Sequence, residues 1–307
     1  MAHVFVTRQL PGNALERLVA EHDVEVWPGD MPPPREDLLA GVADADGLLS
    51  MLVDKVDGEL LDAAPKLRAV ANYAIGFDNI DLEAAAARDV QVGHTPDVLT
   101  DATADLAWAL MLGVARRIVE AAQDARDGKW RTWEPQGWIG ADVHGATLAV
   151  VGAGRIGQAV AKRASGFEME VLMVDLGDDL HSALERADFV SIHTPLTPDT
   201  RHLIDADALA RMKPTAILVN TARGPIVDQD ALAAVLSEGR LAGAGLDVTD
   251  PEPLPPEHPL YATPNLLVVP HIGSATTTAR AAMADRAVDN LLAALDGKPM
   301  PYAVPRP

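Results

Sequence analysis

Short apolar runs alternate with helix-like stretches through most of this chain, in two successive series. The first series extends from Val4 to Val92 and includes the strand-like runs HVFVTRQL, GLLSML and LRAVANYAIG. The second begins at Thr147 and includes TLAVVG, MEVLMVD, FVSIHTPL, AILVNTARG and LLVVPHIG. Parallel strands need a crossover, usually a helix, between them. The rhythm therefore predicts two doubly wound α/β domains, each a parallel sheet with helices on both faces, and a cleft between the domains.

Two longer helices are predicted outside this alternation. A polar turn, HTPDVLTDATAD, leads into an amphipathic stretch that predicts one long helix from about residue 104 to residue 127. Thr100 or Asp101 can cap it by accepting a hydrogen bond from a free N–H group in its first turn. The last helix, at about residues 276–295, has apolar residues at helical spacing, and we expect it to fold back on the first series.

Charge and cysteine content exclude several classes of protein. The 307 residues include 45 Asp and Glu against 25 Lys and Arg, a formal net charge of -20. Most of such a surface would repel a phosphate backbone or an anionic membrane, so we expect no nucleic-acid partner and no membrane. The absence of cysteine excludes disulfides, thiol nucleophiles and thiolate metal sites. Together with an N-terminal sequence that lacks the features of a secretory signal, this predicts a cytoplasmic protein.

A glycine-rich turn opens the second series. Gly152, Gly154 and Gly157 form G-x-G-x-x-G between the strand-like LAVVG and the helix-like RIGQAVAKRA. The first glycine allows a tight turn, the second lets a pyrophosphate approach the backbone, and the third lets helix and strand pack closely. Free N–H groups at the start of the helix favour a diphosphate. Tight turns also use glycine for structural reasons alone, so the flanking strand and helix, together with Asp175, carry the prediction of a dinucleotide site.

Asp175 ends the next strand, 18 residues after Gly157. Its carboxylate can accept hydrogen bonds from both hydroxyl groups of an adenosine ribose, whereas a 2'-phosphate would be repelled, and DLGDDL offers no cation to compensate. NAD(H) is therefore the expected cofactor, with NADP(H) as the alternative. A purely structural interpretation is that Asp175 caps the following turn.

Three polar residues stand at the ends of strands in the second series. Arg223 follows AILVNTA, Glu252 follows GLDVTDP, and His271 follows LLVVP. The carboxyl ends of parallel strands border the ligand crevice, so we expect these side chains to converge near the nicotinamide. Arg can hold a substrate carboxylate bidentately, His can pass the proton that accompanies hydride transfer, and Glu beside His orients the ring and favours imidazolium. Taken singly, each has a structural alternative: a solvated turn residue, a cap in a proline-rich loop, and a satisfied interior histidine.

Other polar and aromatic residues receive structural interpretations. The remaining His residues show no metal-ligand spacing, and no metal site is predicted. His193, in SIHTPLT, is interpreted as a packing residue of a strand. Trp130, Trp133 and Trp138 lie between the two series, where packing at a hinge or an interface is the simplest interpretation.

Over nearly its whole length the chain resembles the D-isomer-specific 2-hydroxyacid dehydrogenase family, above all its glyoxylate/hydroxypyruvate reductase branch. The motifs that carry the resemblance are NYAIGFDNID, HTPDVLTDATADLA, VVGAGRIGQAVAKR, HTPLTPDTRHLI, NTARGPIVD, GAGLDVTDPEPLPPEHPL and VPHIGSAT. The resemblance implies a discontinuous, flavodoxin-like substrate-binding domain made of residues 1–98 and 275–307. It also implies a Rossmann NAD-binding domain at residues 99–274, and a homodimer.

The resemblance also assigns roles to the three strand-end residues and to the cofactor turn. Arg223 in NTARG matches the substrate-binding arginine, Glu252 in DPEP its acidic partner, and His271 in PHIGSAT the acid/base. The positions that match cofactor-binding residues of the family are Thr103, Gly152, Ala153, Gly154, Arg155, Ile156, Asp175, Thr194, Pro195, Thr221, Ala222, Arg223, Asp247, His271 and Gly273.

Further substrate contacts are implied outside this set. The loop Ala74, Ile75 and Gly76 matches the segment whose backbone N–H groups bind the substrate carboxylate, with Leu52 opposite it. Trp138 is similar to a tryptophan that reaches the active site of the neighbouring subunit.

Two departures from the family pattern concern the cofactor. Several members of this branch prefer NADP(H) and carry arginine-bearing sequences after the second strand, where this chain has Asp175-Leu176-Gly177. The departure favours NAD(H). Only the twelve residues Leu176 to Ala187 separate Asp175 from Asp188, too few for the helix and strand that usually follow. We therefore expect the adenine side of the cofactor site to be trimmed.

The resulting hypothesis is an oxidoreductase that uses NAD(H) to reduce small 2-oxo acids, glyoxylate and hydroxypyruvate in particular, to 2-hydroxy acids. Two alternatives come from relatives of the family. One is an NAD(H)-sensing, corepressor-like binding protein, against which the complete Arg, Glu and His set argues. The other is a dehydrogenase for another substrate such as phosphite, in whose branch a lysine stands where this chain has Ile75.

Overall fold

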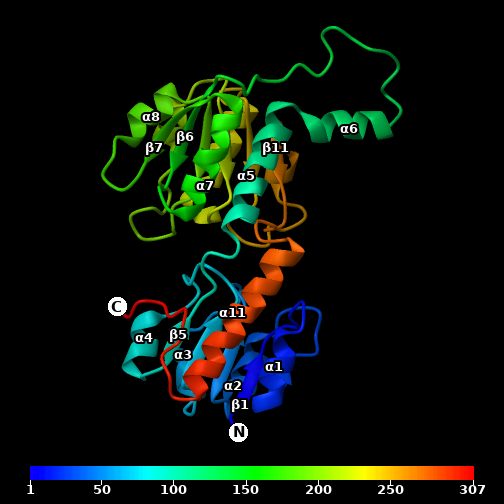
Figure 1. Ribbon diagram of the computed structural model, residues 1–307. Helices are drawn as coiled ribbons and strands as arrows, with labels where there is room; N and C mark the ends of the chain where they lie inside the picture. Colours follow the sequence, from blue (N-terminus) through cyan, green and yellow to red (C-terminus); the bar gives the residue numbers. More distant parts are fainter. The chain divides into compact units, whose positions relative to one another are not determined.

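The computed structural model describes residues 1–307, which divide into two compact units. Unit 1 comprises Met1–Leu99 and Ala275–Pro307, and unit 2 comprises Thr100–Ser274. Each unit is built on one parallel sheet with helices on both faces (Figure 1). The sequence prediction of two parallel α/β sheets is confirmed.

Unit 1 contains a five-stranded sheet with the order β2-β1-β3-β4-β5. Its elements are β1 (His3–Val6), α1 (Ala14–Glu21), β2 (Asp23–Val26), α2 (Arg35–Val42), β3 (Gly47–Ser50), α3 (Gly58–Ala63), β4 (Ala69–Asn72), α4 (Leu82–Ala87), β5 (Gln91–Gly93) and α11 (Thr277–Leu295). Helix α11 comes last in the chain and packs on the sheet of this unit, as predicted. Its N-cap is Thr276, whose hydroxyl accepts a hydrogen bond from the Ala279 N–H at 3.1 Å.

The core of unit 1 lies on both faces of this sheet, because successive strand residues point to opposite faces. Val4 and Val6 pack with α1 and α11, in a cluster that includes Leu18 and Leu291. Phe5 between them packs on the other face, in a cluster formed with α2, α3 and α4. Both faces are thus apolar along the same strand, which is typical of a parallel sheet covered by helices on both sides.

Unit 2 contains a six-stranded sheet with the order β11-β10-β9-β8-β6-β7. Its elements are α5 (Thr100–Ala115), α6 (Ile118–Arg126), β6 (Thr147–Val151), α7 (Arg155–Ala164), β7 (Glu170–Val174), α8 (Leu180–Arg186), β8 (Phe189–Ile192), α9 (Ala206–Arg211), β9 (Ile217–Asn220), α10 (Gln229–Ser237), β10 (Gly243–Leu246) and β11 (Leu266–Val268). None of the helices in the chain is both long and apolar enough to cross a membrane.

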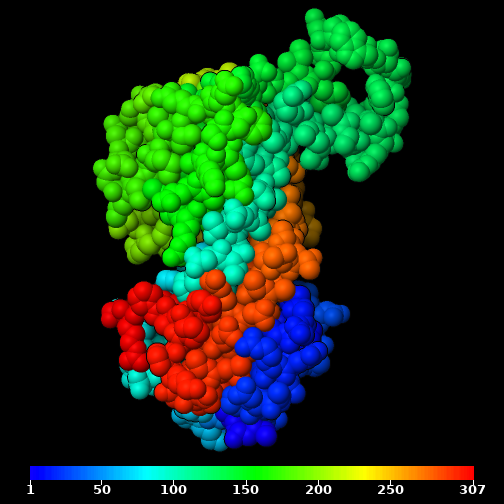
Figure 2. All heavy atoms as spheres, in the orientation of Figure 1, coloured from blue at the N-terminus to red at the C-terminus, as the bar shows by residue number.

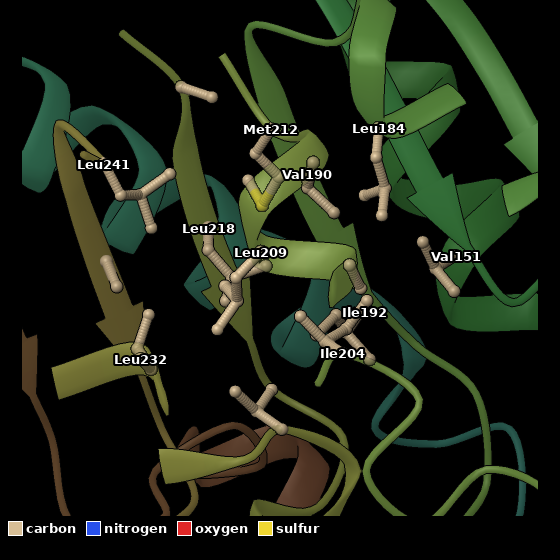
Figure 3. Packing of buried hydrophobic residues seen from close by; sticks show 14 of the residues in the cluster. Val151, Leu184, Val190, Ile192, Ile204, Leu209, Met212, Leu218, Leu232 and Leu241 are labelled. Atoms are coloured by element: carbon tan, nitrogen blue, oxygen red, sulfur yellow. The ribbon is translucent and has the colours of Figure 1, made fainter. Parts of the chain in front are cut away.

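Two apolar clusters cover the faces of the unit 2 sheet. On one face Val151, Ile192 and Leu218 meet residues of α8, α9 and α10, such as Leu184 and Leu209 (Figure 3). On the other face, alternate residues of the same strands pack against α5 and α7 in a second cluster. Each fully buried aliphatic side chain contributes roughly 1.5–3 kcal/mol, so these clusters hold the strand ends in fixed positions.

The single long helix predicted for residues 104–127 is wrong at its start and in the middle, whereas its predicted end is close to Arg126, where α6 ends. The helix begins at Thr100, so Asp101 lies in its first turn, where its carboxylate accepts a hydrogen bond from Arg163 at 2.9 Å, and neither residue is the cap. The chain then breaks at Arg117, whose φ of 52° is left-handed. A left-handed residue cannot continue a right-handed helix, and α6 starts after it.

Helix α6 and the loop that follows it, residues 127–141, stand out from the body of unit 2 (Figures 1 and 2). We call residues 118–141 the arm. No residue of α6 is buried, and Ile118 and Val119 are 53% and 51% exposed. The arm also carries Trp130 and Trp133, which are 76% and 80% exposed. These exposed apolar side chains therefore gain little from packing within their own chain.

The short segment after Asp175 forms a helix but no strand. Helix α8 follows β7 after a five-residue connection, residues 175–179, and the chain then enters β8 directly. As a result β7 is the edge strand, with no partner beyond it. In a dinucleotide-binding sheet of order 3-2-1-4-5-6, one more strand would pair there.

Candidate active site

Six loops meet at one edge of the unit 2 sheet, because all six strands are parallel. They begin with Gly152 after β6, Asp175 after β7, His193 after β8, Thr221 after β9, Asp247 after β10 and Val269 after β11. In open α/β sheets ligands bind outside the carboxyl ends of the strands. This edge is therefore where a ligand is expected, and most of the residues predicted for unit 2 lie on it.

The turn from β6 to α7 leaves room for a pyrophosphate. Gly152 has a φ of 102°, and a Cβ there would lie 2.6 Å from the Thr194 nitrogen. A Cβ on Gly157 would lie 2.0 Å from the Gly152 oxygen, so both positions need glycine for the fold itself. A Cβ on Gly154 would meet no protein atom within 4 Å, and Gly154 precedes α7 without a side-chain cap. The uncapped N–H groups and the open space above Gly154 suit a dinucleotide phosphate.

The connection after β7 is a tight, acidic turn. The Asp175 N–H donates to Asp178 Oδ2 at 2.8 Å, and the Asp178 N–H donates to the Asp175 carbonyl at 3.0 Å. Asp179 caps α8 by accepting from the Ser182 N–H. Leu176, beside Asp175, is 87% exposed. Three carboxylates and no basic side chain thus occupy residues 175–179.

His271 and Glu252 form a direct pair. His271 Nδ1 lies 2.5 Å from Glu252 Oε1, and the two side chains are 25% and 30% exposed. The backbone of His271 is left-handed, with a φ of 51°. Glu252 engages one ring nitrogen, so Nε2 is the nitrogen that remains for proton exchange with a substrate.

Asp247 fixes the turn that carries His271. Its carboxylate accepts hydrogen bonds from the Ile272 and Gly273 N–H groups at 2.6 and 2.8 Å, and its carbonyl accepts from the His271 N–H at 2.9 Å. Burial raises the pKa of Asp247 above its ordinary value, while these N–H groups and His271 oppose the rise. Thr103, in the first turn of α5, donates to the Gly273 carbonyl at 3.3 Å.

The loop that carries Arg223 is organised by a buried asparagine. Asn220 Nδ2 donates to the Arg223 carbonyl at 2.8 Å, and Asn220 Oδ1 accepts from the Ala222 N–H at 3.0 Å. A Cβ on Gly224 would lie 2.0 Å from the Thr249 carbonyl oxygen. This close backbone approach places the Arg223 loop against the segment that leads to Glu252.

His193 joins two of the six loops. Its Nε2 lies 2.7 Å from Ser191 Oγ, and its Nδ1 lies 3.5 Å from Thr221 Oγ1. Burial lowers the pKa of His193 to about 4, so the ring is neutral at neutral pH. Sequence reasoning gave His193 only a packing role, whereas the structure adds a polar link to the loop before Arg223.

In unit 1, the loop of residues 74–76 follows β4. Its carbonyl groups are all hydrogen-bonded within the unit, whereas its Ile75 and Gly76 N–H groups are not. All three carbonyl oxygens accept hydrogen bonds: Ala74 from the Thr95 N–H at 2.8 Å, Ile75 from His94 Nδ1 at 2.8 Å, and Gly76 from Asn72 Nδ2 at 2.9 Å. The Ile75 and Gly76 N–H groups donate to no group of this unit. Such an arrangement suits an anion, because unpaired N–H dipoles attract negative charge. Leu52 lies in the loop after β3, the strand adjacent to β4.

Trp138 lies in the arm rather than on the sheet edge. Its ring is 40% exposed, and the Arg117 guanidinium lies 4.6 Å from the ring centroid. The three arm tryptophans belong to unit 2, and all three are exposed rather than packed inside it. The structure contains no group of three or more His, Cys, Asp or Glu that could hold a metal ion.

The residues that sequence reasoning missed are mainly asparagines. Asn72 and Asn220 are fully buried, and each ends a strand and organises the loop that follows. A signal was present in the sequence, because a buried asparagine at a strand end needs partners for its amide. Nothing in the sequence shows which carbonyl groups those partners are.

Comparisons with known proteins agree with the fold. The model of the D-isomer specific 2-hydroxyacid dehydrogenase NAD-binding domain matches residues 108–273. A glyoxylate reductase of Thermococcus kodakarensis is 48% identical over 318 residues, covering 98% of this chain and 95% of the relative. The crystal structure of a Thermus thermophilus protein has a TM-score of 0.94 and 52% identity, covering 99% of this chain and 100% of that one.

A second solved structure is that of the NADPH-dependent glyoxylate/hydroxypyruvate reductase of Sinorhizobium meliloti, in complex with NADP and malonate. It has a TM-score of 0.87 and 32% identity, and the match covers 99% of this chain and 97% of that one. The matched family domain and the open space above the glycine turn together indicate a nicotinamide dinucleotide cofactor. The chain belongs to the D-isomer specific 2-hydroxyacid dehydrogenase family and is an oxidoreductase that acts on CH–OH groups.

Proposed function

We propose that this protein reduces glyoxylate and hydroxypyruvate to the corresponding 2-hydroxy acids, with NADH as the reductant. The observation that carries the proposal is the His271–Glu252 pair at 2.5 Å, on the sheet edge that also carries the Arg223 loop and the glycine turn. A titratable ring held by a carboxylate beside an arginine is what reduction of a 2-oxo acid requires. The names of the relatives give the substrate class.

The proposed roles follow from the chemistry of each side chain. The bound nicotinamide supplies the hydride that reduces the carbonyl carbon. His271 donates a proton from Nε2 to the carbonyl oxygen, and in the reverse direction takes it back. Glu252 orients the ring through its hydrogen bond to Nδ1. Arg223 binds the substrate carboxylate and polarises the carbonyl.

Unit 1 is proposed to supply the remaining substrate contacts. The N–H groups of Ala74, Ile75 and Gly76 bind the carboxylate, which is consistent with the orientation of that loop. Leu52 limits the size of the substrate side chain. The cofactor contacts in unit 2 are proposed for the residues named above on the family pattern. Among them, the positions that line the adenosine or nicotinamide ends are Thr194, Pro195, Thr221, Ala222 and Asp247.

The decisive test is the removal of the imidazole. We expect His271→Ala to lower kcat for glyoxylate reduction by about 10²- to 10⁴-fold, because proton transfer is lost, with little change in NADH affinity. His181→Ala, which removes an exposed histidine of the same unit, is the matched control and should leave both unchanged. Near-normal turnover in His271→Ala would contradict the role of His271. Tight NADH binding by the wild-type protein without turnover of any 2-oxo acid would favour a sensing function.

We further propose that NADH is preferred over NADPH. Three carboxylates in residues 175–179 would repel a 2'-phosphate, and the turn contains no arginine or lysine to bind it. This differs from the Sinorhizobium meliloti neighbour, which is described as NADPH-dependent. We expect kcat/KM for NADH to exceed that for NADPH by at least about tenfold, and Asp175→Ser to reduce the ratio. Initial rates with the two cofactors at fixed glyoxylate measure it, and a wild-type preference for NADPH would overturn the assignment of Asp175.

Finally, we propose that the protein is a homodimer assembled through the arm. The exposed Ile118, Val119, Trp130 and Trp133 form the kind of apolar surface that marks a protein–protein contact. On the family pattern, Trp138 then contacts the active site of the partner subunit. Sedimentation or light scattering is the direct measurement.

A further inference from the structure

We infer that Asn72 and Asn79 are positioning residues that lock the two loops of unit 1 proposed to contact the substrate into one rigid arrangement, and so set the affinity for the substrate carboxylate. The two loops are residues 51–54, after β3, and residues 74–76, after β4. The inference rests on the proposed function, because it concerns the carboxylate of a 2-oxo acid. It adds two residues to which neither the sequence motifs nor the family pattern gave a role.

The two side-chain amides bridge the loops directly. Asn72 Nδ2 donates to the Gly76 carbonyl at 2.9 Å and to Asn79 Oδ1 at 3.0 Å. Asn79 Nδ2 donates to the carbonyl of Asp54 at 2.8 Å and to that of Met51 at 3.2 Å. One amide therefore binds one loop, the other amide binds the other loop, and a hydrogen bond joins the two amides.

Every donor of this pair is used. Each amide nitrogen has two hydrogens, and the four contacts above take all of them. Asn72 Oδ1 accepts from Ser50 Oγ at 3.1 Å, and both Ser50 and Asn72 are fully buried. Inside a protein, a fully satisfied polar network fixes one arrangement, because any movement leaves a buried group unpaired. The pair thus opposes any independent movement of either loop.

The effect on the substrate comes through the backbone. The Ile75 and Gly76 N–H groups can bind a carboxylate only while the carbonyls of the loop are held away from it, since a carbonyl oxygen would repel the anion. Asn72 holds the Gly76 carbonyl and His94 holds that of Ile75. Asn79 acts indirectly, because it hydrogen-bonds to Asn72 and to the turn that contains Leu52. Neither asparagine touches the substrate, so their effect is expected on substrate affinity rather than on proton transfer.

The experiment compares variants of residues on the same short segment. Asn79→Ala removes the bridge, and Asn79→Asp keeps the size of the side chain but replaces both donors by a carboxylate oxygen opposite two carbonyls. The matched control is Asp81→Ala, two residues away, which removes the N-cap of α4 but leaves the bridge intact. For each protein we would measure KM and kcat for glyoxylate, the Kd for NADH by fluorescence, and the Kd of oxalate for the protein–NADH complex.

We expect both Asn79 variants to raise KM for glyoxylate and the Kd of oxalate by about ten- to a hundredfold, as expected for the loss of a partly buried side chain that makes several hydrogen bonds. The effect should be larger for Asn79→Asp. The Kd for NADH should stay within about twofold, because the glycine turn lies in unit 2. Asp81→Ala should lower thermal stability but leave KM within about twofold. The same KM for Asn79→Ala and Asp81→Ala would overturn the inference, because a purely structural role predicts that result.

A milder variant tests the same inference if the Asn79 variants do not fold. Ser50→Ala removes only the hydrogen bond to Asn72 Oδ1, and a two- to fivefold rise in KM is expected from it on the scale of one neutral hydrogen bond. No rise in a folded Ser50→Ala protein would also count against the bridge. Failure of the wild-type protein to reduce any 2-oxo acid is a different outcome, since it contradicts the proposed function itself.

Discussion

At the scale of single residues, both the imidazole of His271 and the backbone turn that carries it are held by hydrogen bonds. Glu252 engages Nδ1, and the Asp247 carbonyl and carboxylate hold the backbone of the same turn. Glycine at position 273 allows this, because a Cβ there would lie 3.0 Å from Asp247 Oδ2. The ring therefore cannot turn away without breaking its hydrogen bond to Glu252, and the turn cannot move without breaking its hydrogen bonds to Asp247. A fixed Nε2 is what efficient proton transfer needs, since geometry precedes pKa in general acid catalysis.

His193 provides a prediction of how stability depends on pH. Its pKa is about 4 in the folded protein and about 6.5 in the unfolded chain, so unfolding takes up a proton between these values. Stability is therefore lost as the pH falls from about 6.5 to about 4. We expect the advantage of the wild-type protein over His193→Asn to shrink by about 2 kcal/mol between pH 7 and pH 5.

Urea unfolding of both proteins at the two pH values measures this difference. The raised pKa values of Asp54 and Asp247 act in the opposite direction, but both proteins share them, so they cancel in the comparison. An advantage that does not depend on pH would show that His193 is protonated equally in the folded and unfolded states.

A functional residue could be predicted from the sequence where its residue type and its place after a strand were enough to indicate a role. Arg223, Glu252 and His271 were found because each follows a strand and carries a reactive group. His193 and Asn79 were missed because their importance lies in their partners, Thr221 and Asp54 among them, which are distant in sequence. No local pattern contains that information.

At the scale of elements, the turn from β6 to α7 contains glycines with two different roles, one in packing and one in leaving space for a ligand. Gly157 serves the contact of helix and strand, since a Cβ would meet the Gly152 carbonyl at 2.0 Å. Gly154 faces open space, so nothing in the protein itself requires glycine there. The same motif thus combines one position for the fold and one for the ligand.

Alanine at these two positions should separate the two roles. We expect Gly154→Ala to change the free energy of unfolding by less than about 0.5 kcal/mol but to raise the Kd for NADH at least about tenfold, because its methyl group would occupy the space of the phosphate. Gly157→Ala should destabilise unit 2 by about 1–3 kcal/mol through overpacking. Urea unfolding and NADH fluorescence titration give the two quantities. NADH binding by Gly154→Ala as tight as that of the wild type would show that the phosphate does not lie there.

Most elements were predictable, and the exceptions have clear causes. The alternation of apolar runs predicted the strands of both sheets. The central strands are apolar throughout because they are buried on both faces, whereas the edge strand β2 alternates valines with exposed acidic residues. The break at Arg117 gave no signal, because neither glycine nor proline marks it and its left-handed φ depends on tertiary structure. The length of the segment after Asp175 predicted a lost element, and the structure shows that the strand is lost while α8 is kept.

At the scale of the whole molecule, the arm leads to a prediction about assembly. The double variant Ile118→Glu/Val119→Glu places two charges on the exposed apolar face of α6. If the arm holds a dimer, this variant should have half the mass of the wild type in light scattering, since an unpaired charge buried in an interface costs several kcal/mol. Its glyoxylate reduction should also fall if Trp138 serves the partner's site.

The matched control is Val19→Glu on α1, which alters an equally exposed valine outside the arm. It should leave the mass unchanged. A wild-type protein that is monomeric at micromolar concentration would contradict the dimer, and an α6 variant that stays dimeric would place the interface elsewhere.

The sequence of unit 1 is interrupted by that of unit 2, and this affects the order in which the two units can fold during synthesis. All of unit 2 is synthesised before α11, and domains generally fold as units during synthesis. The first 99 residues must wait, because Val4 and Val6 pack in a cluster that α11 completes with Val288 and Leu291. A chain that ends before residue 277 therefore contains every residue of unit 2, but the sheet of its unit 1 has one apolar face uncovered. That sheet is the surface a chaperone would be expected to shield until the last helix arrives.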